Sequence, residues 1–182
     1  MALMYTPEAQ LGSACPEFTG TTLLGETKSL SDYNEEALVF MFICNHCPYV
    51  KAIENRLAKL SEKLQESHSV RFIAICSNDA SDYPEDSAEN LKLTAKRLNF
   101  KFDYIVDESQ KIAKDFTAIC TPDFFVYDKN RQLTYRGRLD DSWKNEAQVT
   151  EHELENAILA TLKSQPIENQ KPSMGCSIKW KS

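Results

Sequence analysis

The chain has 182 residues, 42% of them hydrophobic, and a net charge of −6. This length fits one domain with a sizeable core, and the interspersed charges argue against nucleic acid or an anionic membrane as a partner. Residues 1–8 have no basic leader, and no later stretch approaches the roughly 18 apolar residues of a membrane span. We therefore expect a cytoplasmic protein whose six cysteines are not a structural disulfide framework.

The first half of the chain alternates predicted strands and helices. Residues 15–30 predict an accessory hairpin, and the unbroken apolar run 38–43 predicts a strand buried on both faces. A helix should begin at Pro48, because apolar residues then recur every three or four positions up to Leu64. Residues 70–76 predict a second buried strand, and Asp86 or Ser87 can cap the next helix.

The second half predicts a short strand at 103–106, a small helix around 112–116 and an antiparallel hairpin of strands 124–127 and 133–139. Thr150 to Glu153 has the pattern of a capping box, which predicts a closing helix. The tail, 164–182, has no helical or strand period but is too apolar for a disordered end. We expect it to pack on the domain, with Gly175 allowing a turn that fixes Cys176.

Cys44-Asn45-His46-Cys47 lies between the first central strand and its helix. Free backbone N–H groups and the helix dipole at such a junction stabilise a thiolate. A CxxC pair in a reducing compartment indicates redox catalysis or metal binding. We expect no metal, because a zinc site needs two further ligands and the remaining candidates are scattered: Cys15, Cys76, Cys120, Cys176, His68 and His152. Haem attachment needs a histidine where Pro48 stands.

Thr121-Pro122 leads directly into a predicted strand, where proline is unusual. An ordinary trans proline at a strand start is the simple interpretation. A cis X–Pro bond is rare, so one at this position would indicate a positional requirement.

Four segments carry a resemblance to a known family. They are Cys44-Asn45-His46-Cys47-Pro48-Tyr49-Val50, Cys120-Thr121-Pro122-Asp123-Phe124-Phe125, Gly137-Arg138-Leu139-Asp140-Asp141-Ser142 and Pro172-Ser173-Met174-Gly175-Cys176-Ser177-Ile178-Lys179-Trp180. As a set they resemble the redoxin (AhpC/TSA, peroxiredoxin-like) branch of the thioredoxin superfamily. The resemblance implies an α/β, thioredoxin-like fold with a redoxin-type βα insertion, spanning residues 1–182 as one domain. It also implies that the Thr121–Pro122 bond is cis and faces the CxxC pair, and that Thr121 and Pro122 hold the backbone of an extended substrate.

On this basis we expect a thiol–disulfide oxidoreductase without a cofactor. Cys44 would be the more acidic thiol and attack a substrate disulfide, and Cys47 would resolve the mixed disulfide. His46 would make the pair more oxidising, because the DsbA family also has histidine at this position. Partners would be protein or small-molecule thiols and disulfides, with an external reductant such as a thioredoxin or glutathione system. Cys120 and Cys176 are candidates for an auxiliary redox role.

Two alternatives remain. The first is a thiol-dependent peroxidase acting through a sulfenic acid at Cys47 or Cys44. Peroxiredoxins carry Pro-x-x-x-Thr-x-x-Cys and a polarising arginine, whereas aligning Cys47 with their cysteine puts Phe40 and Cys44 in place of the proline and threonine. The second is a non-catalytic thioredoxin-like binding module, in which the thiols only pack.

Overall fold

The computed structural model describes residues 3–181. The ten strands are β1 (Leu3–Tyr5), β2 (Thr19–Thr22), β3 (Thr27–Ser29), β4 (Ala37–Phe42), β5 (Val70–Cys76), β6 (Asp103–Val106), β7 (Cys120–Thr121), β8 (Asp123–Tyr127), β9 (Leu133–Gly137) and β10 (Met174–Ser177). The four α-helices are α1 (Pro48–Ser67), α2 (Ala88–Arg97), α3 (Lys111–Asp115) and α4 (Glu153–Leu162). The expected domain spans residues 1–182, of which Met1, Ala2 and Ser182 lie outside the described residues.

A seven-stranded sheet in the order β3-β2-β6-β5-β4-β8-β9 forms the centre of the molecule. β4, β5 and β6 are parallel, whereas β8 runs antiparallel to β4 and forms a hairpin with β9. Every residue of β4 is buried, as its unbroken apolar run predicts. The hairpin of β2 and β3 extends the other edge, so the accessory hairpin is confirmed.

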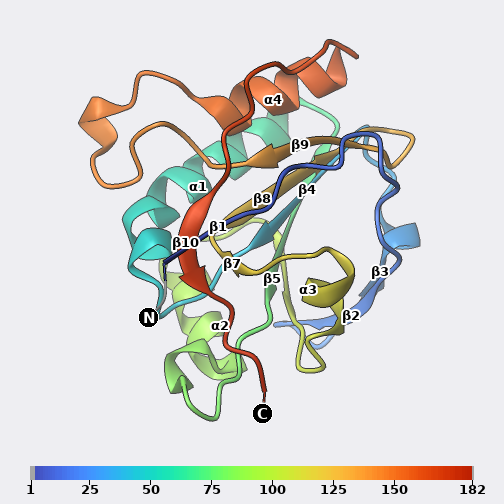
Figure 1. The fold of residues 1–182 in the computed structure, drawn as a ribbon. Helices are drawn as coiled ribbons and strands as arrows, with labels where there is room; N and C mark the ends of the chain where they lie inside the picture. The colour runs from blue at the N-terminus through green and yellow to red at the C-terminus, as the bar shows by residue number, and fades with distance from the viewer. Residues whose placement is uncertain (1–2, 182) are drawn as a thin grey trace.

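Helices cover both faces of this sheet (Figure 1). α1 and α4 pack on one face, where Val39 and Met41 of β4 meet Val50, Ile53 and other apolar residues of the helices. α3 lies on the opposite face, against the alternate β4 residues, including Phe40 and Phe42. This layering leaves the carboxyl end of β4 and the first turn of α1 next to each other, where open α/β sheets place their sites.

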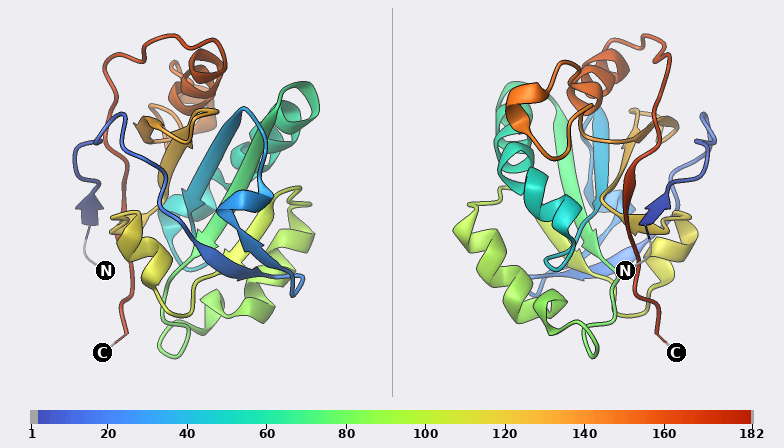
Figure 2. Two further views of the ribbon diagram at one scale, coloured as in Figure 1. Left: turned by 90° about the vertical axis from the view of Figure 1, so that its right-hand side faces the viewer. Right: turned by 60° about the vertical axis from the view of Figure 1, so that its left-hand side comes forward.

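The C-terminal tail forms a strand, which the lack of a period in its sequence did not predict. β10 pairs antiparallel with β1 on one side and with β7 on the other, giving a second, three-stranded sheet. Figure 2 shows β10 and β1 side by side in both views. The expected turn at Gly175 is wrong: Gly175 lies inside β10, opposite Met4.

Of the two predicted helix caps, the one at Ser87 is confirmed and the one at Thr150 is wrong. Ser87 caps α2, and its hydroxyl accepts from the N–H of Asn90 at 3.4 Å. The predicted capping box at Thr150 is wrong, because α4 begins only at Glu153 and Thr150 bonds to Asp141 instead. The Thr150 side chain can bond either within its own turn or to a residue outside it, and in the structure it bonds to Asp141.

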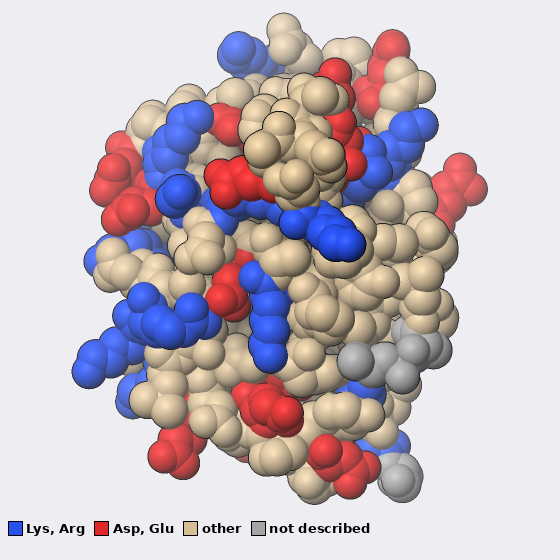
Figure 3. All heavy atoms as spheres, turned by 90° about the vertical axis from the view of Figure 1, so that its left-hand side faces the viewer, with Lys and Arg blue, Asp and Glu red and all other residues tan. Residues whose placement is uncertain are grey.

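On the face shown in Figure 3, the blue Lys and Arg side chains and the red Asp and Glu side chains are interspersed. Within residues 3–181, no helix combines the length and apolarity that crossing a membrane requires.

Candidate redox site

The two CxxC cysteines occupy different structural positions, although only two residues separate them. β4 ends at Phe42, and Cys44 follows in the loop. Cys47 is the N-cap of α1, with extended backbone angles (φ −74°, ψ 120°), and Pro48 opens the helix. Proline suits this first helical position because it has no N–H group to leave unsatisfied. Cys47, and not Cys44, is therefore the thiol nearest the free N–H groups of the helix.

Both thiols lie against the loop that contains the cis peptide bond Thr121–Pro122. The Sγ atom of Cys44 is 3.3 Å from the Thr121 hydroxyl, and the Sγ atom of Cys47 lies 3.1 Å from the Thr121 carbonyl oxygen, to which it donates when it is protonated. Cys44 is 2% exposed and Cys47 is fully buried. All six cysteines are present as thiols. The structure thus brings together Cys44, Cys47, Thr121 and Pro122 in a closed, reduced site.

The acidity of the two thiols is opposite to the sequence-based expectation. Hydrogen bonds from the thiols of Cys44 and Cys176 and from the N–H groups of Val50 and Cys176 outweigh burial and lower the pKa of Cys47 to about 5. Burial, the hydrogen bond given to Cys47 and the charge of Asp86 raise the pKa of Cys44 well above its ordinary value. The expectation that Cys44 is the more acidic thiol is therefore wrong, because Cys47, as the N-cap residue of α1, is the thiol that accepts hydrogen bonds from backbone N–H groups.

Asp86 is a residue of the site that the sequence did not reveal, since its position suggested a helix cap. Its buried carboxylate accepts from the N–H groups of Asn45 (2.7 Å) and His46 (3.1 Å), from His46 Nδ1 (2.5 Å) and from Asn78 (2.9 Å). Burial opposes ionisation, but these bonds from His46, Asn78 and Asn45 keep the pKa of Asp86 below its usual value. Asp86 thereby fixes the Asn45-His46 turn between the two cysteines.

Replacing Asp86 by alanine is expected to lower the free energy of unfolding by about 1–3 kcal/mol, because buried donors of Asn45, His46 and Asn78 lose their acceptor. Urea unfolding measures the change. Asp86→Asn keeps one acceptor oxygen and should cost less than Asp86→Ala. An alanine variant as stable as the wild type would show that the carboxylate does not organise this turn.

Cys44, His46 and Asp86 place potential ligand atoms within 4.8 Å of one another. We assign them to the hydrogen-bond network, because Asp86 already accepts from three residues and His46 Nδ1 is one of its donors. His46 Nε2 is buried without a hydrogen-bond partner among the described residues. The expectation of no metal remains a prediction, which metal analysis of the purified protein tests.

β10 covers the cysteine pair. Cys176 pairs with Thr121 in the strand register, and its thiol and N–H both hydrogen-bond the sulfur of Cys47. Gly175 comes so close to β7 that an added Cβ would lie 1.9 Å from the Thr121 carbonyl oxygen. The backbone position that we expected a substrate to use at Thr121 is therefore taken by the chain's own tail.

The remaining cysteines are Cys15, Cys76 and Cys120, and all three are buried. Cys15 and Cys76 are buried, and burial raises the pKa of both thiols, of Cys15 to about 12. Cys120 is fully buried in β7, where burial and the nearby charge of Asp123 raise its thiol pKa. The auxiliary redox role expected for Cys120 stays a prediction.

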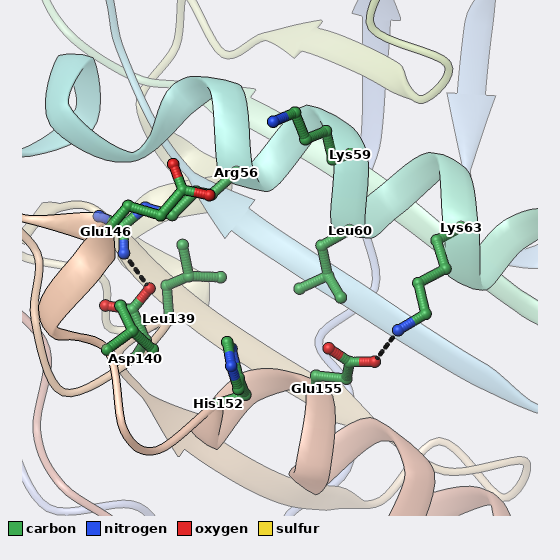
Figure 4. Close-up of a pocket in the computed structure, with 10 residues that line it drawn as sticks. Arg56, Lys59, Leu60, Lys63, Leu139, Asp140, Glu146, His152 and Glu155 are labelled. Carbon is green, nitrogen blue, oxygen red and sulfur yellow. Dashed lines mark hydrogen bonds and ion pairs between the residues drawn. The ribbon is translucent and has the colours of Figure 1, made fainter.

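A surface pocket lies elsewhere, between α1 and α4 (Figure 4). Arg56 and Asp140 form an ion pair on one side of it, and Lys63 pairs with Glu155 on the other. None of the residues that line this pocket is a cysteine or belongs to the predicted site.

Comparisons with known proteins agree with the fold and the family resemblance. The chain is 44% identical to an uncharacterized conserved protein from Geobacillus kaustophilus (TM-score 0.93, covering 100% of this chain and 97% of that one). It is 35% identical to a hypothetical protein from Sinorhizobium meliloti 1021 (TM-score 0.93, covering 98% of each chain).

A more distant structural relative is a secreted Mycobacterium tuberculosis disulfide oxidoreductase homologous to E. coli DsbE (19% identity, TM-score 0.61, covering 79% of this chain and 95% of that one). This likeness confirms the thioredoxin-like fold. No curated protein gives a significant match. The AhpC/TSA family model matches residues 11–136. The chain therefore belongs to the AhpC/TSA family, in the redoxin branch of the thioredoxin superfamily.

Proposed function

We propose that the protein is a thiol–disulfide oxidoreductase in which Cys47 attacks and Cys44 resolves. The observation that carries this proposal is the position of Cys47 at the N-terminus of α1, in contact with a second thiol three residues away. A thiolate is the attacking species in disulfide exchange, and the hydrogen bonds that Cys47 accepts from Cys44, Cys176 and Val50 favour it as that thiolate.

In the first step the Cys47 thiolate attacks one sulfur of the substrate disulfide, and the other sulfur leaves as a thiolate. Cys44 then loses its proton and attacks the sulfur of Cys47. The Cys44–Cys47 disulfide forms, and the substrate is released fully reduced. An external dithiol, such as that of a thioredoxin or glutathione system, returns the pair to the reduced state. The Thr121 hydroxyl, 3.3 Å from Cys44, can receive a hydrogen bond from the resolving thiol.

Substrate access requires β10 to move, because both sulfurs are buried beneath it and β7. Once β10 leaves, Cys47 loses its cover at Cys176 and the edge of Thr121 becomes available for pairing. An extended segment of the substrate can then take the place of β10, as strand addition at sheet edges does in peptide recognition.

The assay that tests this function compares two oxidants on the reduced protein. We expect glutathione disulfide to form the Cys44–Cys47 bond faster than hydrogen peroxide does at the same concentration. Faster oxidation by peroxide would favour the peroxidase alternative instead. Against that alternative, the guanidinium of the buried Arg136 already donates to the Asp123 carboxylate and to the Thr117 carbonyl oxygen. A binding module without catalysis predicts that Cys44→Ser leaves the cellular effect unchanged.

The reduction potential should lie above that of thioredoxin, about −270 mV, and below that of DsbA, about −120 mV. A stabilised Cys47 thiolate favours the reduced form and so makes the pair more oxidising. His46 contributes less than its position suggests, because its Nδ1 is bound to the Asp86 carboxylate. Equilibration with glutathione gives the potential directly. A value at or below about −270 mV would contradict this expectation.

A further inference from the structure

Cys47 contacts two other thiols, and only one of them belongs to the CxxC pair. Cys44 and Cys176 each hydrogen-bond the sulfur of Cys47 through their own side chains. The first comes from the loop after β4, and the second comes from β10, some 130 positions later in the sequence. Cys47 therefore has a candidate exchange partner on each of two separate chain segments.

The position of Cys176 is fixed on both sides by specific contacts. Before it, the hydroxyl of Ser173 donates to the Pro122 carbonyl oxygen at 2.6 Å, and the Ser173 N–H donates to the Thr6 hydroxyl at 3.0 Å. After it, the N–H of Ile178 donates to the Ile119 carbonyl oxygen at 2.9 Å. These bonds hold the strand against the cis-proline loop and direct the Cys176 side chain to Cys47.

The adjacent glycine adds a second constraint. A Cβ at Gly175 would meet the carbonyl oxygen and carbon of Thr121 at 1.9 and 2.5 Å, so the two backbones can approach this closely only without a side chain. Close approach of the backbones is what brings the next residue, Cys176, within reach of Cys47. The backbone N–H of Cys176 also hydrogen-bonds the Cys47 sulfur, which fixes the strand at this point of contact.

The geometry points to Cys176 as a third redox thiol, which exchanges with Cys47 to convert the Cys44–Cys47 disulfide into a Cys47–Cys176 disulfide. This inference rests on the proposed function, which supplies the first disulfide. Cys176 gives up its proton and attacks the sulfur of Cys47. The Cys47–Cys176 bond forms as the Cys44–Cys47 bond breaks, and Cys44 leaves as a thiolate that takes up the proton. The exchange is internal, so no outside oxidant or reductant takes part.

The exchange has a structural consequence for access to the site. A Cys47–Cys176 bond ties β10 covalently to α1 and keeps the edge of β7 covered. Cys44 becomes a thiol again in this closed form. The oxidised protein would then exist in two forms, one whose tail can open and one whose tail is locked.

Disulfide mapping by mass spectrometry tests the inference on the full-length protein, after oxidation with glutathione disulfide and acid trapping. The wild type should yield both Cys44–Cys47 and Cys47–Cys176 linked peptides, with Cys15 and Cys76 reduced as internal controls. Cys44→Ser should first carry glutathione on Cys47 and then lose it as Cys47–Cys176 forms. The matched double variant, Cys44→Ser with Cys176→Ser, should retain the glutathione adduct.

A Cys44→Ser protein that keeps the adduct with Cys176 reduced would overturn the inference, as would a wild type that forms Cys44–Cys47 alone at every glutathione ratio. The wild-type map gives this answer even if the serine variant fails to fold. The proposed function fails in a different way. In that case neither the wild type nor Cys176→Ser forms a Cys44–Cys47 bond or reduces glutathione disulfide.

Discussion

Replacing Cys47 by serine is expected to abolish steady-state disulfide reduction, because the attacking thiolate and one half of the product disulfide are both lost. The remaining thiols are mainly protonated at neutral pH: that of Cys176 has a pKa raised to about 12 by burial and by Cys47. A thiolate of higher pKa is intrinsically more nucleophilic, which offsets part of the loss in the rate of attack. Single-turnover attack should then fall by roughly 30- to 150-fold, using the usual dependence of thiol reactivity on pKa. Stopped-flow oxidation by glutathione disulfide measures this rate.

Cys44→Ser is the informative comparison for this prediction. It should retain the fast attack, because Cys47 is still present and the serine hydroxyl still donates to its sulfur. It should lose resolution by the CxxC pair. Cys15→Ser, a buried cysteine outside the cluster, should behave as the wild type. If Cys44→Ser loses the fast phase and Cys47→Ser keeps it, the roles of the two cysteines are reversed.

The second large effect concerns the tail. Gly175→Val should prevent β10 from seating on β7, since its Cβ would overlap the Thr121 backbone, which cannot move aside as a flexible side chain can. Cys47 would then react with iodoacetamide at least about tenfold faster. A tenfold change corresponds to a decrease of about 1.4 kcal/mol in the free energy needed to open β10. Peptide mapping after timed alkylation measures the rate at each cysteine.

Ser177→Ala is the matched control, because it lies in the same strand, next to Cys176, and is only half-buried. Its Cys47 should alkylate at the wild-type rate. Equal rates in Gly175→Val and in the wild type would mean that β10 does not control access, and that substrates reach Cys47 by another route.

The sequence predicted the elements that are marked by a long hydrophobic pattern in their own residues. β4 is a continuous apolar run, and α1 carries apolar residues at helical spacing over five turns, so neither depends on distant contacts to be recognised. The CxxC pair and the cis-proline were found for the same reason, because each is a short pattern at a fixed place in the chain. Their proximity was implied by the resemblance to thioredoxin-like folds.

What the sequence did not predict depends on contacts between distant segments. β10 has four residues, including a glycine, and its strand conformation comes from pairing with β1 and β7. Asp86 looked like a helix cap because its partners, Asn45 and His46, lie some 40 residues earlier. The acidity of Cys47 was missed because part of it depends on Cys176, which only the pairing of β10 with β7 brings to the Cys47 sulfur.

The most direct test of the central claim, that Cys47 is the thiolate of this site, is a pH titration of thiolate absorbance in the ultraviolet. It does not require a reagent to pass β10. Because hydrogen bonds stabilise the ionised form, the thiolate signal should rise with pH through an apparent pKa near 5 in the wild type. The same signal should persist in Cys44→Ser and vanish in Cys47→Ser. A signal that first rises near the value of a free thiol, about 8.5, or that survives in Cys47→Ser, would contradict the account.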